Sequence, residues 1–89
     1  MVYRLRLTLK DSELILDYRE QGTDEWGFAV RCSFSDPAQA HKEFGALRAL
    51  RLPAHGVIAA FRDWNCIIPV ALQGADSVLL MKEQDFIER

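Results

Sequence analysis

The sequence has few of the residues that mark disulfide-rich proteins. Only two cysteines, Cys32 and Cys66, occur among its 89 residues, so at most one disulfide can form. Both cysteines lie in apolar segments, where a free thiol behaves as a small hydrophobic group. This composition excludes a disulfide-stapled scaffold and leads us to expect a reduced, cytoplasmic protein.

Long hydrophobic runs and an excess of one charge are also missing. The longest apolar run, residues 66–72, is much shorter than a membrane span, and Arg4 and Arg6 stand where a signal peptide would be apolar. Eleven basic residues against thirteen acidic ones give a net charge of −2. We therefore expect no membrane contact, and the charge balance excludes both a general polyanion binder and an acidic DNA mimic.

The remaining composition is that of a folded globular protein, with 49% hydrophobic, 27% charged and 10% aromatic residues. A chain of this length has room for one core, so we expect a single domain over residues 1–89. A small domain leaves a large share of its surface exposed, and oligomerisation is a common supplement to its stability.

Residues 3–20 are predicted to form a β-hairpin whose register is fixed by two patterns. Apolar and polar residues alternate from position 3 to 9 and again from 14 to 18, which is typical of half-buried strands. If Lys10 faces Glu13, leucines meet leucines on one face and Arg6 meets Asp17 on the other. A slip of one residue would destroy both sets of pairs.

A third strand is predicted from Trp26 to about Phe34. Pairing Tyr18 with Trp26 places Gln21-Gly22-Thr23 at the tip of the turn, where glycine suits a three-residue loop. In this register Leu16 faces Phe28, and Leu14 faces Val30. The like charges of residues 20 and 24 then face each other, which indicates a frayed or wider loop.

Asp36-Pro37 predicts the start of a helix, with Asp36 as N-cap and Pro37 in the first turn. Its apolar stripe is Ala40, Phe44, Leu47 and Leu50, and Pro53 ends it near residue 50 or 51.

The last third is expected to hold a second meander. A hairpin is predicted from residues 57–62 and 66–72, although residues 53–64 also fit a helix with Val57, Phe61 and Trp64 on one face. In the hairpin reading, Pro69 marks an edge or bulge of its strand. Residues 73–76 should form a turn, residues 77–82 a strand, and residues 83–89 a short helix or a frayed end. The predicted fold is therefore α+β, with a mainly antiparallel sheet or half-barrel of about six strands in the order βββα-βββ(α) and one main helix.

The strands predicted in the last third are apolar on both faces, so they need two covers. One helix covers one face. The other cover could be the first meander, a second copy of the chain, or another protein. If a partner exists, its contact residues should include the tryptophans and the second of these strands: Trp26, Trp64, Ile68 and Val70.

Chemical motifs are scarce. The sequence has no glycine-rich phosphate loop, HExxH, CxxC or GxSxG pattern, and the spacing of its two cysteines and two histidines matches no paired-ligand zinc site. We therefore expect no metal, no cofactor and no catalytic residue. One basic cluster, at the end of the predicted helix and beyond, combines Arg48, Arg51, His55 and Arg62. It could contact phosphate or carboxylate, although cations at a helix C-terminus are also favoured by the helix dipole alone.

These observations favour a small, non-enzymatic protein–protein interaction module, such as an inhibitor, accessory protein or assembly subunit of bacterial or phage type. It would act by occlusion through an apolar interface, as a homodimer or with another protein. The alternative is a nucleic-acid-binding regulator that uses Arg48, Arg51 and Arg62, whose affinity would fall steeply with salt.

Overall fold

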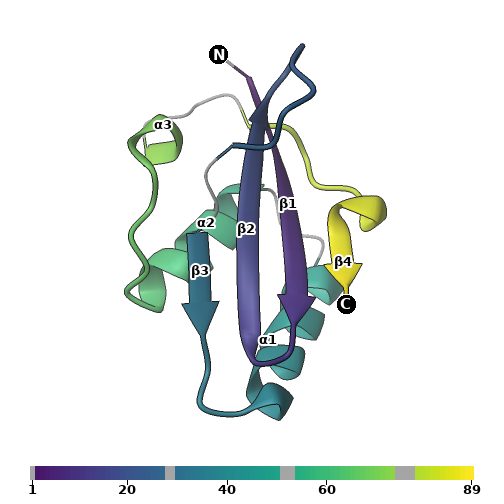
Figure 1. Ribbon diagram of the computed structural model, residues 1–89, viewed down its shortest axis with the longest axis vertical. Coiled ribbons are helices and arrows are strands. Elements are labelled where there is room, and N and C mark those ends of the chain that lie inside the picture. Colours follow the sequence, from purple (N-terminus) through teal and green to yellow (C-terminus); the bar gives the residue numbers. More distant parts are fainter. Residues whose placement is uncertain (1, 28–29, 51–53, 74–77) are drawn as a thin grey trace.

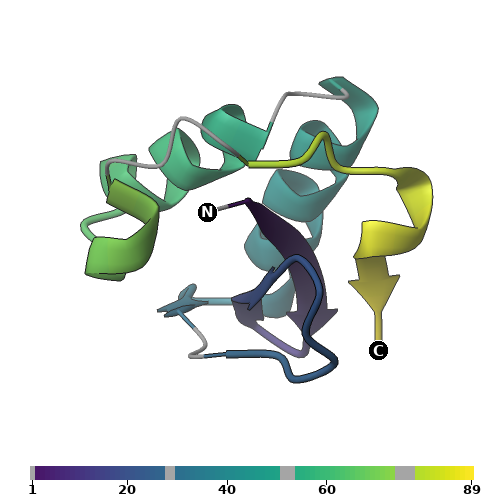
Figure 2. The same cartoon turned by 90° about the horizontal axis from the view of Figure 1, so that it is seen from above.

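A four-stranded sheet, in the order β3-β2-β1-β4, packs with one face against the helices. The view along the strands places α1 and α2 side by side on that face, and the loop after β2 on the opposite one (Figures 1 and 2). The computed structural model describes residues 2–27, 30–50, 54–73 and 78–89. Its elements are β1 (Tyr3–Lys10), β2 (Glu13–Glu20), β3 (Val30–Ser33), α1 (Pro37–Leu50), α2 (Ala54–Asp63), α3 (Val70–Gln73), the 3-10 turn η1 (Glu83–Asp85) and β4 (Phe86–Glu88).

The first hairpin has the register that the sequence predicts. Lys10 pairs with Glu13, Leu7 with Leu16, and Arg6 with Asp17. On the outer face, the Arg6 guanidinium donates a 2.9 Å hydrogen bond to the Asp17 carboxylate. On the inner face, the leucines of both strands are buried. Burial and charge pairing therefore select the same register, as the sequence analysis expected.

The predicted third strand is shorter and shifted by two residues. β3 begins at Val30, which pairs with Leu16 where Phe28 was expected, and Cys32 pairs with Leu14 where Val30 was expected. Phe28 itself lies outside the described residues. A shift of two keeps the same residues facing the helices, so the core is preserved. Trp26 was predicted to pair with Tyr18 but lies outside any strand, under the guanidinium of Arg6 at 4.1 Å from the ring centroid.

The tip of this turn is confirmed as a glycine position, because Gly22 has a φ of 95°.

The predicted helix α1 is also confirmed. Its N-cap Asp36 accepts a 3.0 Å hydrogen bond from the Gln39 amide, and Ala40, Phe44 and Leu47 are buried. The helix extends to Leu50, whose side chain lies outside the described residues.

The predicted hairpin of residues 57–62 and 66–72 is wrong, and the helical alternative is right for its first half. α2 buries Ala54, Val57, Ile58 and Phe61, at the spacing of one helix face. Asn65 then ends the helix with a φ of 62°, and the Cys66 amide donates to the Phe61 carbonyl at 3.0 Å. Residues 66–69 form a linker to α3, so Pro69 precedes a helical turn instead of interrupting a strand.

The C-terminal part was also predicted wrongly. Ser77 lies outside the described residues, and residues 78–82 form only an isolated bridge between Val78 and Tyr3 where a strand was expected. The short helical turn at Glu83–Asp85 was one of two expected options. β4 follows it and pairs parallel with β1, with Phe86 opposite Leu7. The fold is thus α+β, as predicted, but its sheet is mixed and four-stranded, because apolar residues expected in strands lie in α2 and in the linker.

Asp85 connects the C-terminal segment to β1. Its carboxylate accepts hydrogen bonds from Arg4 Nε at 3.2 Å and Arg4 Nη2 at 3.0 Å, and also from the Lys82 amide at 2.9 Å. The next residue, Phe86, packs edge-on against Phe44 of α1, with 6.1 Å between ring centroids. Asp85 therefore positions β4 at the edge of the sheet, next to β1 and beside α1.

No helix among the described residues has both the length and the hydropathy needed to cross a membrane.

Candidate functional site

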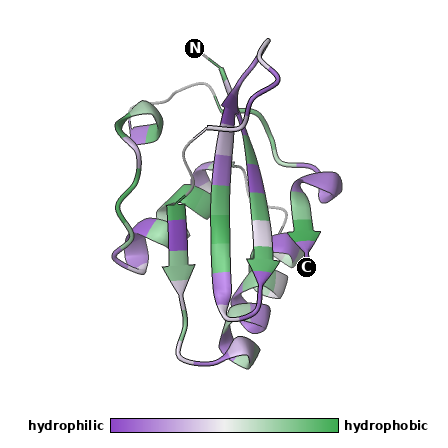
Figure 3. Ribbon diagram, in the orientation of Figure 1, coloured by the Kyte–Doolittle hydropathy of each residue, from purple (hydrophilic) through white to green (hydrophobic). Residues whose placement is uncertain are grey.

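Three large hydrophobic side chains among the described residues are exposed to solvent. Ile67 is 88% exposed, Val70 is 84% exposed and Leu80 is 69% exposed. Ile67 and Val70 lie three positions apart, at the linker and at the first residue of α3. We call these two residues the linker patch. Figure 3 colours the segment between α2 and α3 largely as hydrophobic, and Figure 1 shows it running beside β3.

The linker patch is displayed by an anchored backbone. Ile68, which lies between the two patch residues, and Leu72, which follows them, are buried. The Gln73 side chain donates a 2.8 Å hydrogen bond to the Ile68 carbonyl, which holds α3 against the linker. The Cys66 thiol lies 3.8 Å from the Arg31 carbonyl of β3. Because these neighbours fix the backbone, Ile67 and Val70 have a defined outward position.

The four residues predicted as an interface are not brought together as one surface. Val70 is exposed, as an interface residue must be, but Ile68 is buried in the core. In a strand both would lie on one face, whereas the linker turns them to opposite sides. Ile67, which the strand pattern placed on the other face, takes the exposed position. The sequence signals its exposure only by placing Ile67 in an apolar run that contains Pro69.

The two tryptophans have structural neighbours. The Trp64 ring lies 5.2 Å from the Phe34 centroid and 5.3 Å from that of Phe61, so it closes one end of the core. Trp26 covers the outer face of the sheet, where Arg6 and Arg19 lie over its ring. Both indoles are half-buried. A partner would therefore touch their edges and not receive a freely projecting side chain.

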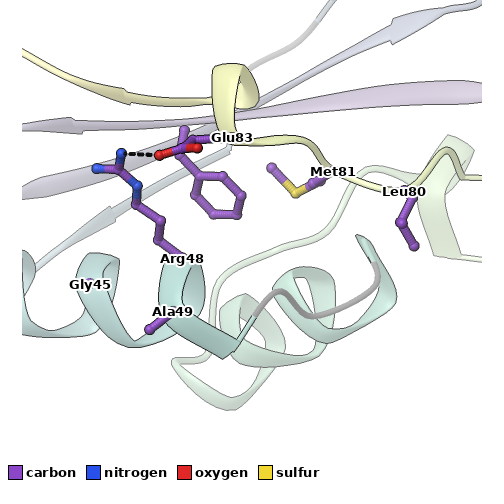
Figure 4. Close-up of a pocket in the computed structure, with 7 residues that line it drawn as sticks. Gly45, Arg48, Ala49, Leu80, Met81 and Glu83 are labelled. Atoms are coloured by element: carbon purple, nitrogen blue, oxygen red, sulfur yellow. Dashed lines mark hydrogen bonds and ion pairs between the residues drawn. The ribbon is translucent and has the colours of Figure 1, made fainter.

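A groove lies between α1 and the C-terminal segment, on another part of the molecule (Figure 4). It has a volume of about 650 Å³, which is within the usual range for small-molecule sites. In Figure 4, Arg48 reaches from α1 to Glu83, and Leu80 and Met81 come from the facing segment. Gly45, Ala49 and Phe86 complete the lining. The lining residues of the described chain combine the apolar side chains of Leu80, Met81 and Phe86 with the charged pair Arg48 and Glu83.

The residues of the predicted basic cluster do not act together at one site. Arg48 Nη2 lies 3.0 Å from the Glu83 carboxylate, so its charge already has a partner. His55 and Arg62 are exposed on α2, seven residues apart and therefore about 10 Å apart along the helix. Arg51 lies outside the described residues. Sequence reasoning missed the Arg48–Glu83 pair, because the two residues are 35 positions apart.

The two cysteines are neighbours, although each was interpreted separately as a buried apolar residue. Cys32 is buried on β3 and Cys66 is half-buried in the linker, and both are free thiols. Burial, followed by a side-chain hydrogen bond with Cys66 and the charge of Cys66, raises the pKa of the Cys32 thiol from 9.0 to about 12. Within the described ranges, no group of three or more His, Cys, Asp or Glu side chains could hold a metal ion.

No known protein family matches the sequence, and neither a curated protein nor a solved structure is similar enough to give a match. The functional assignment therefore depends on the surface of the chain itself.

Proposed function

We propose that this protein is a non-enzymatic interaction module, and that the linker patch is the centre of its contact surface. The observation behind this proposal is the nearly complete exposure of Ile67 and Val70 on an anchored linker. Single exposed hydrophobic residues are common, but here two branched side chains are exposed three positions apart on one short segment. Their burial would contribute about 1.5–3 kcal/mol for each side chain.

The anchoring of the linker supports this proposal on energetic grounds. A flexible segment must lose conformational entropy when it binds, and this loss subtracts from the affinity. Here the backbone is fixed beforehand by the burial of Ile68 and Leu72 and by the Gln73 hydrogen bond. The patch can therefore meet a partner without first becoming ordered.

A second copy of the chain is the partner that we propose. The linker runs beside the β3 edge. In a twofold dimer built on this surface, the linker patch of one copy would bury the linker patch of the other. The net charge of −2 creates little repulsion between copies. A small domain also gains a larger fraction of its stability from such an interface than a large one does. Each copy would then bury the linker patch of the other when the dimer forms.

The test is light scattering on a size-exclusion column over a tenfold range of protein concentration. Wild type should change from monomer to dimer, and the double variant Ile67→Asp/Val70→Asp should stay monomeric with an unchanged unfolding temperature. Leu80→Asp is the matched control, because Leu80 is also exposed but lies in the groove on another part of the molecule. It should dimerise like wild type. A wild-type monomer at every concentration, or equal loss in both variants, would show the proposal to be wrong.

Nucleic-acid binding through Arg48, Arg51 and Arg62 stays a prediction. Labelled DNA and RNA at low salt test it directly, because binding that depends on arginine–phosphate contacts is strongest there.

A further inference from the structure

The strongest chemical feature outside the linker patch is the proximity of the two cysteines. Cys32 comes from β3 and Cys66 from the linker, and the Cys66 thiol lies 3.8 Å from the carbonyl of Arg31, the residue before Cys32. The position of Cys66 is fixed by the Asn65 turn that ends α2, and by contacts of its thiol with the carbonyls of Arg31 at 3.8 Å and Trp64 at 3.9 Å. The side chains of residues far apart in the sequence are thus held together by the fold.

The two thiols differ in access. Cys66 is half-buried, whereas Cys32 is buried in the core. A reagent therefore reaches Cys66 first. We propose that Cys32 and Cys66 are a reversible redox pair, in which Cys66 is the attacking thiol and Cys32 the resolving thiol, and that a small-molecule disulfide oxidises them to an intramolecular disulfide.

The reaction proceeds in two thiol–disulfide exchanges. The Cys66 thiolate attacks one sulfur of the reagent disulfide, the reagent S–S bond breaks, and half of the reagent leaves as a thiolate that takes up the Cys66 proton. The Cys32 thiol then loses its proton and attacks the Cys66 sulfur of the mixed disulfide. The second half of the reagent leaves with that proton. Two protein thiols have lost two electrons, and one reagent disulfide has become two thiols.

The environment of the pair supports this order of events. Burial and the neighbouring Cys66 raise the Cys32 pKa to about 12, from an ordinary value of 9.0. This lowers its thiolate fraction at neutral pH about 1,000-fold, and the greater nucleophilicity of the more basic thiolate recovers only part of that loss. Cys32 is buried and ionises less readily than an ordinary thiol, so it should react slowly with an external reagent, but it can attack a mixed disulfide that is held beside it.

The product would join the linker covalently to β3. Cys66 lies immediately before Ile67, so oxidation would fix the segment that bears the linker patch. The redox chemistry itself requires no partner protein. Its test is therefore independent of the proposed function, and either proposal can fail without the other.

The experiment treats the folded, reduced full chain with Ellman's reagent, an aromatic disulfide that releases one coloured thiolate at each exchange. Wild type should release two thiolates for each chain. The first release should rise in rate with reagent concentration, and the second should not, because it is the internal attack by Cys32. Peptide mapping by mass spectrometry should then identify a Cys32–Cys66 disulfide.

Two single variants complete the test. Cys32→Ala should release one thiolate quickly and retain a stable mixed disulfide on Cys66. Cys66→Ser should react at least several-fold more slowly than Cys32→Ala, because its remaining thiol is buried. A second release whose rate rises in proportion to reagent concentration would overturn the proposal, as would a product with one reagent group on each cysteine. Disulfides between chains as the main product would also overturn it. The wild-type kinetics and mapping decide the question even if a variant fails to fold.

Discussion

Alanine variants of Asp85 and Glu83 should show how differently a buried and an exposed ion pair contribute to stability, although the two acidic residues are only two positions apart. Asp85 and Glu83 both accept a 3.0 Å hydrogen bond from an arginine Nη2 atom. The Asp85 side chain, however, is 6% exposed and the Glu83 side chain is 81% exposed. Distance alone would assign the two pairs the same strength, whereas solvent screening predicts very different ones.

The expected loss for Asp85→Ala can be worked out from its contacts. Removal of the carboxylate eliminates two hydrogen bonds from Arg4, worth roughly 1–2 kcal/mol after allowance for the partial exposure of the guanidinium. It also removes the acceptor for the Lys82 amide, worth about 1 kcal/mol, as is typical of a side-chain cap. The free energy of unfolding should fall by about 2–3 kcal/mol, and the midpoint of thermal unfolding by roughly 10–20 °C.

Urea and thermal unfolding, followed by circular dichroism, measure both variants. Glu83→Ala is the control, and its stability should change by less than about 0.5 kcal/mol. A loss below about 1 kcal/mol for Asp85→Ala, or equal losses for the two variants, would refute this reasoning. It would mean that β4 is held against β1 by its backbone pairing and by the Phe86–Phe44 contact, and not by Asp85.

Further predictions concern the helices and the buried thiol. Gly45→Ala should raise the free energy of unfolding by about 0.5–1 kcal/mol in a urea titration, because Gly45 is inside α1 and a Cβ there meets nothing within 4 Å. Phe61→Ala should lower it by about 3–5 kcal/mol, because this ring is fully buried where α2 packs on the sheet; an effect below 1 kcal/mol would contradict the helical packing. The Cys32 thiol ionises near pH 9 in the unfolded chain and near 12 in the folded one, so the reduced protein should lose stability as the pH rises from about 9 toward 12. Cys32→Ala should reduce that alkaline loss, and urea titrations at several pH values would show whether it does.

The N-terminal half of the fold could be predicted because local signals agree there. In the first hairpin, alternation and the Arg6–Asp17 pair select one register, and in α1 the Asp36 cap and the buried stripe select one helix. For the third strand, the buried face was predicted correctly but the register was not. Trp26 stacks under Arg6 instead of continuing the strand, and cation–π contacts of this kind leave no periodic signal.

The C-terminal half could not be predicted because its apolar runs fit two periods. Residues 57–61 alternate poorly as a strand, yet a run of apolar residues without a polar face is compatible with strand and helix alike. β4 has three residues, which is too few for any periodicity, and its parallel partner lies at the other end of the chain. For the candidate site, sequence patterns indicated Val70 but not Ile67, and gave no sign that Cys66 lies beside β3, near Cys32. Such proximity depends on the path of the linker along β3, which only the tertiary structure decides.

The position of β4 has a consequence for synthesis on the ribosome. β1 lies between β2 and β4 in the sheet, but β4 follows every other element in the chain. A nascent chain can close the first hairpin early, while the other edge of β1 keeps unsatisfied amides and carbonyls until β4 emerges. Such an edge is a template for pairing with neighbouring chains. The sheet can therefore be completed only after β4 has emerged, and a chain truncated before β4 would be prone to aggregate.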